Sequence, residues 1–243
     1  MPATKVIAPT TLGLVFFIVT VFGFFTAEAQ CDSTAGGYSL SIELLHEDIG
    51  VAEGYGSSVD LSGFNTYRVY LECEDPADKL SAIEGNDNRP LNVSSTTGFY
   101  QTSPFSGSAN ALPNFISPIL YTSFPDIVYD SWVTIGIEET ADSGANETEV
   151  KLTEDSSNPL SNGFASGNDL IINSAAGSAW YIQDSDNYSN GLAGTNSKVL
   201  VAQLTTDGQI SGQMGMQVFR NGISTTENCV RPYLSFQSHG CME

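Results

Sequence analysis

The polar loop from Asp184 to Gly191 carries the side chains best suited to bind a metal ion. Its sequence, DSDNYSNG, brings Asp184, Asp186 and Asn190 close together. Calcium takes about six to eight oxygen ligands, and loops rich in Asp, Asn and Gly supply them. The spacing departs from an EF-hand loop, because Tyr188 stands where an oxygen ligand belongs. We expect either a calcium site or a solvated loop here, and no other cofactor is indicated.

Paired carboxylates are a second candidate chemistry, because glycoside hydrolysis needs an acid and a second carboxylate flanking the bond. The best-placed acids, on or beside predicted strands, are Glu72, Asp126, Asp130 and Glu138. Since the chain has 28 acidic residues, some pair will always satisfy the required distance, so the inference is weak. No Gly-x-Ser-x-Gly motif occurs, and His46 and His239 are interpreted as surface or structural residues. An enzyme is therefore the less favoured interpretation.

Aromatic side chains are a third candidate, since a ring with one exposed face can stack on a sugar. The candidates are Trp132, Trp180 and Tyr181. Both tryptophans fall inside predicted strands, so packing in the core is the competing interpretation.

Four cysteines, Cys31, Cys73, Cys229 and Cys241, form an even set. In an oxidising compartment such a set predicts two disulfides, with three possible pairings left open. A zinc site is poorly supported, because no Cys-x-x-Cys motif occurs.

Asn92, Asn146 and Asn187 begin Asn-x-Ser/Thr sequons, which are glycosylation acceptors if the host is eukaryotic.

Residues 1–29 are typical of a secretory signal peptide. Lys5 precedes an uncharged apolar run from Leu12 to Phe25, and Ala27-Glu28-Ala29 has small residues where a signal peptidase reads. A retained membrane anchor is the alternative, since the uncharged stretch reaches spanning length. We expect a protein secreted to the exterior or the cell surface, with no membrane contact after cleavage.

The net charge of -20 excludes some partners. Nucleic acid is not expected as a partner, because phosphate contacts require clustered Lys and Arg, and the chain has only 8 such residues. An anionic membrane surface is disfavoured by the same sign of charge.

Short β-strands account for most of the predicted structure after residue 30. They combine β-branched and aromatic residues with period-two alternation, and are expected at 67–72, 131–138, 170–172, 179–182, 198–204 and 210–219. Asp207-Gly208 predicts a tight hairpin turn, because this pair adopts the positive φ angles that such turns require. The best short helix candidates are residues 43–49 and 77–83.

Strands at this spacing, without alternating long helices, predict an all-β fold: an antiparallel β-sandwich, jelly-roll-like or Ig-like, with disulfide-tied termini. We expect one domain over residues 30–222 and a cysteine-bounded tail over residues 223–243.

Several stretches resemble a module that recurs in uncharacterised secreted proteins of marine and aquatic bacteria and algae. The resemblance covers residues 63–221 and rests on Tyr67-Arg68-Val69-Tyr70-Leu71, on Asp130-Ser131-Trp132-Val133-Thr134-Ile135-Gly136 and on residues 199–208. It implies a surface or matrix role and no established activity.

The expected function is an extracellular structural or assembly protein, calcium-dependent if the acidic loop binds that ion. Self-association, other extracellular proteins and polysaccharide are the expected partners. The alternative is a carbohydrate-binding module of the β-sandwich type, and a secreted carbohydrate-active enzyme comes third.

Overall fold

The computed structural model describes residues 31–33, 36–102, 111–157, 159–160, 163–183 and 188–238. Within these ranges the strands are β1 (Ser39–His46), β2 (Gly50–Glu53), β3 (Ser58–Leu61), β4 (Asn65–Glu72), β5 (Lys79–Gly85), β6 (Leu91–Ser95), β7 (Trp132–Val133), β8 (Lys151–Thr153), β9 (Leu170–Ile172), β10 (Ser178–Tyr181), β11 (Lys198–Thr206), β12 (Ile210–Phe219), β13 (Cys229–Val230) and β14 (Tyr233–Gln237). One short α-helix, α1 (Leu120–Ser123), is present, with 3-10 turns η2 (Pro113–Phe115), η3 (Pro125–Tyr129), η4 (Ser143–Ala145), η6 (Phe164–Ser166), η8 (Ser189–Gly191), η9 (Gly194–Asn196), η10 (Arg220–Gly222) and η11 (Thr226–Asn228).

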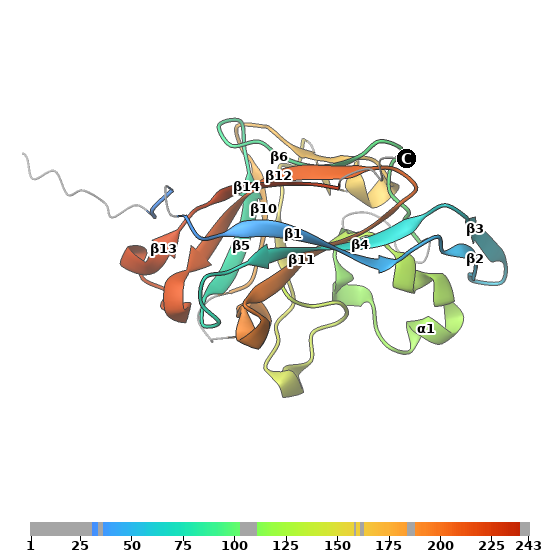
Figure 1. Cartoon of the computed structure of the whole chain (residues 1–243), viewed down its shortest axis with the longest axis horizontal. Coiled ribbons are helices and arrows are strands. Elements are labelled where there is room, and N and C mark those ends of the chain that lie inside the picture. Colours follow the sequence, from blue (N-terminus) through green and yellow to red (C-terminus); the bar gives the residue numbers. More distant parts are fainter. Residues whose placement is uncertain are drawn as a thin grey trace, which may run out of the picture.

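The described strands form two stacked antiparallel sheets and a separate β2–β3 hairpin (Figure 1). The smaller sheet has the order β1-β4-β11-β7, and the larger sheet contains β5, β6, β8, β9, β10, β12, β13 and β14. The predicted all-β antiparallel sandwich is therefore confirmed.

Strand β12 lies at the centre of the larger sheet. On one side its two halves pair with β6 and β5, and on the other side with β14 and β13. Beyond these, β10 pairs with β5 and β8, and β9 pairs with β6. Residues 229–237 of the predicted tail are thus built into this sheet.

The core lies between the two sheets, because alternate side chains of each strand point inward. In β4, for example, Val69 and Leu71 are completely buried, whereas Arg68 and Tyr70, which alternate with them, are only half-buried. On the outer face of the smaller sheet a second apolar cluster joins Leu200 and Trp132 to residues 113–129, which we call the cap segment.

Four local predictions are wrong. Residues 43–46 belong to β1 and residues 79–83 to β5, so neither helix candidate is a helix. Only Trp132–Val133 of the stretch 131–138 is a strand. Strands β11 and β12, on either side of Asp207-Gly208, do not pair but belong to different sheets.

The turn at Gly208 shows why the hairpin prediction failed. Neither Asp207 nor Gly208 has a positive φ, so the pair does not form the expected primed turn. A Cβ atom at Gly208 would lie 2.5 Å from the Oγ1 atoms of Thr96 and Thr97. Glycine is needed here for close packing where the chain crosses from one sheet to the other.

One predicted disulfide is present, between Cys31 and Cys229 at a sequence separation of 198 residues. Cys73 differs from the prediction, because it carries a free thiol that is 9% exposed beside the core. Burial, with Asp78 and Glu72 nearby, raises the pKa of this thiol to about 12, so Cys73 behaves as a small apolar residue. Cys241 lies outside the described residues.

Candidate functional site

A groove runs over the outer face of the smaller sheet, between the cap segment and the loop of residues 134–147. It consists of three adjoining hollows of about 150, 440 and 330 Å³, and Glu138 lines each of them. We call them together the outer groove. Its polar lining includes His46, Arg68, Tyr121, Glu147, Lys198 and Gln203.

A β-bulge in β11 brings Gln203 into this groove. The register between β11 and β4 shifts between Leu200 and Ala202, so one extra residue is accommodated at this point. As a result Val201 and Ala202 both face the core, whereas Leu200 and Gln203 both lie on the outer face. Strict alternation from Leu200 would have turned Gln203 inward.

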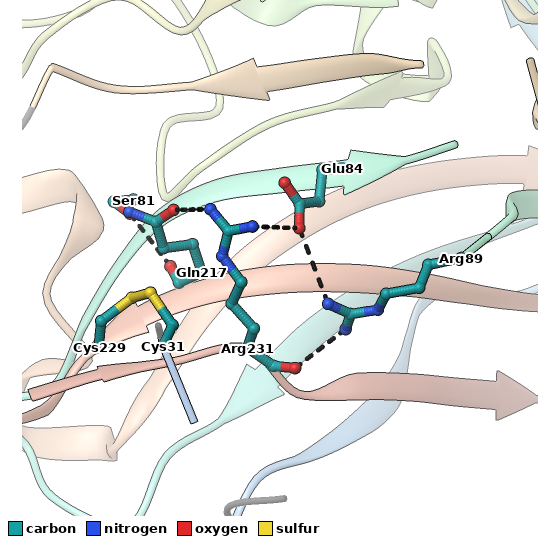
Figure 2. Close-up of a disulfide and its surroundings, with 7 residues drawn as sticks. All are labelled: Cys31, Ser81, Glu84, Arg89, Gln217, Cys229 and Arg231. Carbon is teal, nitrogen blue, oxygen red and sulfur yellow. Dashed lines mark hydrogen bonds and ion pairs between the residues drawn. A yellow bond between two sulfur atoms is a disulfide. The ribbon is translucent and has the colours of Figure 1, made fainter. Parts of the chain in front are cut away.

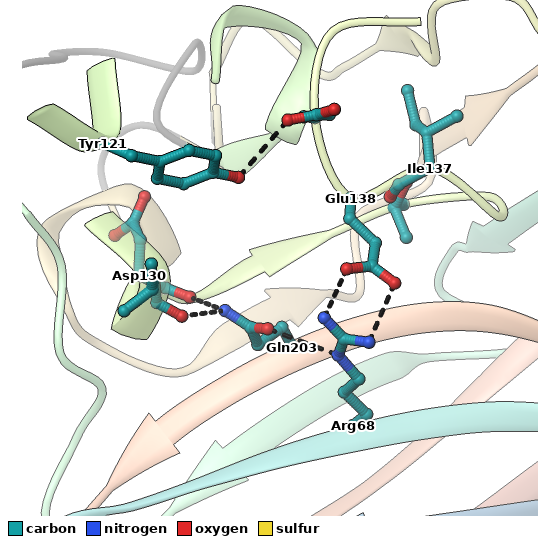
Figure 3. Close-up of polar contacts among 9 residues, drawn as sticks. Arg68, Tyr121, Asp130, Ile137, Glu138 and Gln203 are labelled. Carbon is teal, nitrogen blue, oxygen red and sulfur yellow. Dashed lines mark hydrogen bonds and ion pairs between the residues drawn. The ribbon is translucent and has the colours of Figure 1, made fainter. Parts of the chain in front are cut away.

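Arg68 is the central polar residue of the groove floor. Its Nη1 and Nη2 atoms donate to the Glu138 carboxylate over 2.8 and 2.5 Å. This bidentate arrangement fixes the guanidinium and carboxylate planes relative to each other. Its Nε atom donates to Gln203 Oε1 over 3.4 Å. Gln203 Nε2 in turn donates to the carbonyl oxygens of Val128 and Asp130 (Figure 3). The sheet, the loop and the cap segment are thereby linked by one hydrogen-bond network.

Two further side chains are uncharged near neutral pH. Burial, and then the Arg68 charge, lower the pKa of His46, which packs edge-on against the Tyr129 ring at 5.2 Å. Burial, with Glu139 nearby, raises the pKa of Tyr121, whose hydroxyl donates to Glu139 Oε2 over 3.4 Å (Figure 3). Both side chains can therefore form hydrogen bonds with a ligand without adding a charge to the groove.

The other end of the groove is bounded by acids and one lysine. Glu139, Asp142 and Glu147 line the hollow beside Glu138. Lys198 Nζ lies 4.2 Å from the centroid of the Tyr70 ring and 3.4 Å from Glu43 Oε2. The groove therefore presents more negative than positive charge, and it favours hydroxyl-rich ligands without negative charge.

The aromatic residues predicted to bind sugar do not form a platform. Trp132 is 2% exposed and Trp180 is 0% exposed, so neither ring has a free face for stacking, and the core-packing interpretation holds for both. Tyr181 is half-buried in β10, in the other sheet.

The first half of the predicted calcium loop lies outside the described residues, which exclude Asp184, Asp186 and Asn187. Asn190 is buried: its Oδ1 accepts from Thr148 N over 3.1 Å, and its Nδ2 donates to Ile135 O over 2.8 Å. Its amide therefore holds the loop of residues 134–147 against η8.

The two sequons within the described ranges differ in accessibility. Asn92 lies in β6, where its Oδ1 accepts from Gln213 N over 2.9 Å. Asn146 is exposed, and it ends η4 in the left-handed conformation. The prediction of glycosylation at both stays a prediction.

The structure does not bring the four acids that were candidates for catalysis to one site. Glu138 lines the outer groove, and Glu72 accepts a hydrogen bond from Ser41 Oγ on β1. Asp126 in η3 and Asp130 just after it lie together and are buried, being 5% and 2% exposed. Of the four, only Glu138 lines the outer groove.

Sequence reasoning missed Arg68, Tyr121 and Gln203 as groove residues. Arg68 and Gln203 were correctly predicted to lie in strands. That both side chains line a groove depends on the bulge in β11 and on the cap segment. Neither the bulge nor the cap segment produces a periodicity or a motif that can be recognised in the sequence.

Comparison with known proteins finds no matching family model, no similar curated protein and no similar solved structure. Within the part of the chain that the structure describes, no helix is long and apolar enough to cross a membrane. The functional argument therefore depends on the geometry of the outer groove.

Proposed function

We propose that this protein is an extracellular binding protein that holds an uncharged polysaccharide chain in the outer groove. The observation that carries the proposal is the network of Arg68, Glu138 and Gln203 at the groove floor. These planar polar groups are already fixed by one another, so little conformational entropy is lost when a ligand contacts them.

The shape and composition of the groove support a chain of sugar rings as the ligand. Three adjoining hollows share Glu138 in their lining, and such a row suits a linear ligand better than a compact one. Hydroxyl groups can donate to carboxylate and amide oxygens and to the Tyr121 hydroxyl oxygen, and they can accept from Arg68 and Lys198. The surplus of carboxylates disfavours sulfated or uronate polymers.

An extracellular location is supported by two features. The Cys31–Cys229 disulfide is of the kind that persists in oxidising compartments. The apolar run from Leu12 to Phe25, followed by Ala27-Glu28-Ala29, is typical of an export signal.

Substitution of groove residues tests the proposal. We expect the wild-type protein to be retained on an insoluble uncharged polysaccharide such as cellulose, chitin, xylan or a β-glucan, and not on alginate or carrageenan. Arg68→Gln and Tyr121→Ala should each raise the Kd for the retaining polymer about tenfold or more, because both remove a preorganised contact. Depletion isotherms measure the Kd.

A tyrosine on the opposite side of the molecule supplies the matched control. Tyr233 is 40% exposed in β14, at the outer face of the larger sheet. Tyr233→Ala should leave the Kd unchanged, with circular dichroism showing that each variant is folded. A wild-type protein that no polymer retains, or a loss of binding in Tyr233→Ala with none in the groove variants, contradicts the proposal.

Assembly is the second candidate function, and an apolar end of the molecule favours it. The β2–β3 hairpin and the cap segment meet where the Tyr55 ring stacks on Phe124 at 4.7 Å (Figure 1). Tyr55, Val51 and Ile119 are 70%, 68% and 78% exposed, and exposed apolar patches mark interaction sites.

Self-association through this end is expected to depend on ions, because copies with a net charge of -20 repel one another at low salt. Sedimentation velocity should show larger species at high salt or in calcium than in chelator. Tyr55→Ser should abolish them. A single monomeric species under every condition excludes assembly.

A further inference from the structure

Two buried carboxylates lie together without a base to neutralise them. Asp126 in η3 and Asp130 just after it are 5% and 2% exposed, and the charge of Asp126 acts on Asp130. Among the described residues neither forms an ion pair with Lys, Arg or His. Burying a carboxylate is costly unless an opposite charge, a proton or a metal compensates for it.

Hydrogen bonds around Asp126 show that it is an acceptor. Tyr100 donates its hydroxyl to Asp126 Oδ2 over 2.6 Å, and Thr102 donates its own over 2.9 Å to the same oxygen. The other oxygen, Asp126 Oδ1, is buried and has no hydrogen-bond partner. An unpartnered buried oxygen of this kind is rare, because it loses its water without replacement.

A proton on Asp130 does not resolve this arrangement. Burial raises the pKa of Asp130, and Asp130 Oδ1 already accepts from Thr102 N over 2.9 Å. Asp126 acts on Asp130 through its charge, and Asp126 Oδ1 has no hydrogen-bond partner. Protonation would therefore neutralise one acid and still leave the orphan oxygen of the other.

We propose that a calcium ion binds at Asp126 and Asp130, with Asp126 Oδ1 as a ligand. Calcium is a hard cation that prefers oxygen ligands. It binds carboxylates through one or both of their oxygens and completes its coordination with backbone carbonyls and water. It supplies the missing charge and a partner for the orphan oxygen together. This site is distinct from the loop containing Asp184 and Asp186.

The site connects three parts of the molecule. Asp126 belongs to the cap segment and is bonded to Tyr100 and Thr102 of a different segment. Gly54 of the turn between β2 and β3 lies against it, since a Cβ atom there would be 3.5 Å from Asp126 Cγ. A bound calcium ion therefore holds the hairpin and the cap segment in place whether or not a polysaccharide binds.

Thermal unfolding in calcium tests the proposal. After dialysis against chelator, adding about 5 mM CaCl₂ to the full chain should raise the Tm by about 3 to 8 °C, given the affinities of extracellular calcium modules. Asp126→Asn should lose this rise, because the amide still accepts from Tyr100 and Thr102 but has no charge. The exposed acid Asp207 supplies the control Asp207→Asn, which should keep it.

A direct binding measurement covers the case in which Asp126→Asn fails to fold. Equilibrium dialysis of the wild-type protein with calcium should give a bound ion that Asp130→Asn weakens at least about tenfold. Absence of calcium binding and of any Tm rise overturns the proposal. So does a response that survives Asp126→Asn and Asp130→Asn but is lost in Asp184→Asn, because the ion would then occupy the loop.

Discussion

Replacing Trp180 by alanine is expected to lower the free energy of unfolding by about 3 to 5 kcal/mol, the usual cost of truncating a large buried aromatic residue. Trp180 is 0% exposed between the sheets, and its indole Nε1 donates to Thr134 O over 3.2 Å. The substitution leaves a cavity in the core and also an unpaired carbonyl. Urea unfolding followed by circular dichroism measures the change.

Trp180→Phe separates these two contributions. It keeps an aromatic ring in the core but removes the donor to Thr134 O, so we expect a smaller loss of about 1 to 3 kcal/mol. Tyr181→Ala at the neighbouring half-buried position should cost less than Trp180→Ala. If Trp180→Phe abolished polysaccharide retention while the protein stayed folded, the sugar-stacking role would be restored and our assignment of Trp180 to the core would be wrong.

Removing the disulfide by Cys31→Ser with Cys229→Ser is expected to cost about 2 to 5 kcal/mol of stability. The bridge closes a loop with a separation of 198 residues, so in the chain-entropy account the unfolded state gains much freedom when it is lost. A protein of this size should then melt at least about 5 °C lower. Differential scanning calorimetry of both forms checks the shift.

The environment of the bridge also matters to this variant. Cys229 begins β13, and Arg231 beyond it forms an ion pair with Glu84 and donates to Gln217 (Figure 2). These contacts remain when the sulfur atoms are replaced, so we expect the sandwich to persist. Cys73→Ser is the control for loss of a cysteine that forms no bridge in the structure. Identical melting of the double variant and the wild type would contradict the prediction.

Much of the sandwich was predictable because its longest strands carry clear patterns. The strands β4 and β12 were found within two residues of their observed bounds, since each combines alternation with β-branched or aromatic residues. In contrast β5 was mistaken for a helix. Both faces of β5 are largely covered, and its Lys79 is 0% exposed. Polar and apolar residues therefore do not alternate along it, as they do in a strand with one solvent-exposed face.

The outer groove was less predictable, because it depends on tertiary features. Residues 134–138 were predicted to continue the strand because they alternate, yet the chain leaves β7 and turns at Gly136, where a Cβ atom would lie 1.7 Å from Asn190 O. Asn190 is distant from Gly136 in the sequence, so no local pattern predicts this contact. The sequence nevertheless singled out Glu138, Asp126 and Asp130 among many acids, although for catalysis.

The central position of β12 limits the order in which the protein can form during synthesis. The chain emerges from its N-terminal end, so β5 and β6 are made long before β12, the strand that joins them into one sheet. In the smaller sheet β4 can pair early with β1, but its second partner, β11, is made much later. Co-translational folding of the N-terminal half is therefore disfavoured, since late strands must supply its partners. A nascent chain arrested before residue 198 should remain protease-sensitive and open to export machinery.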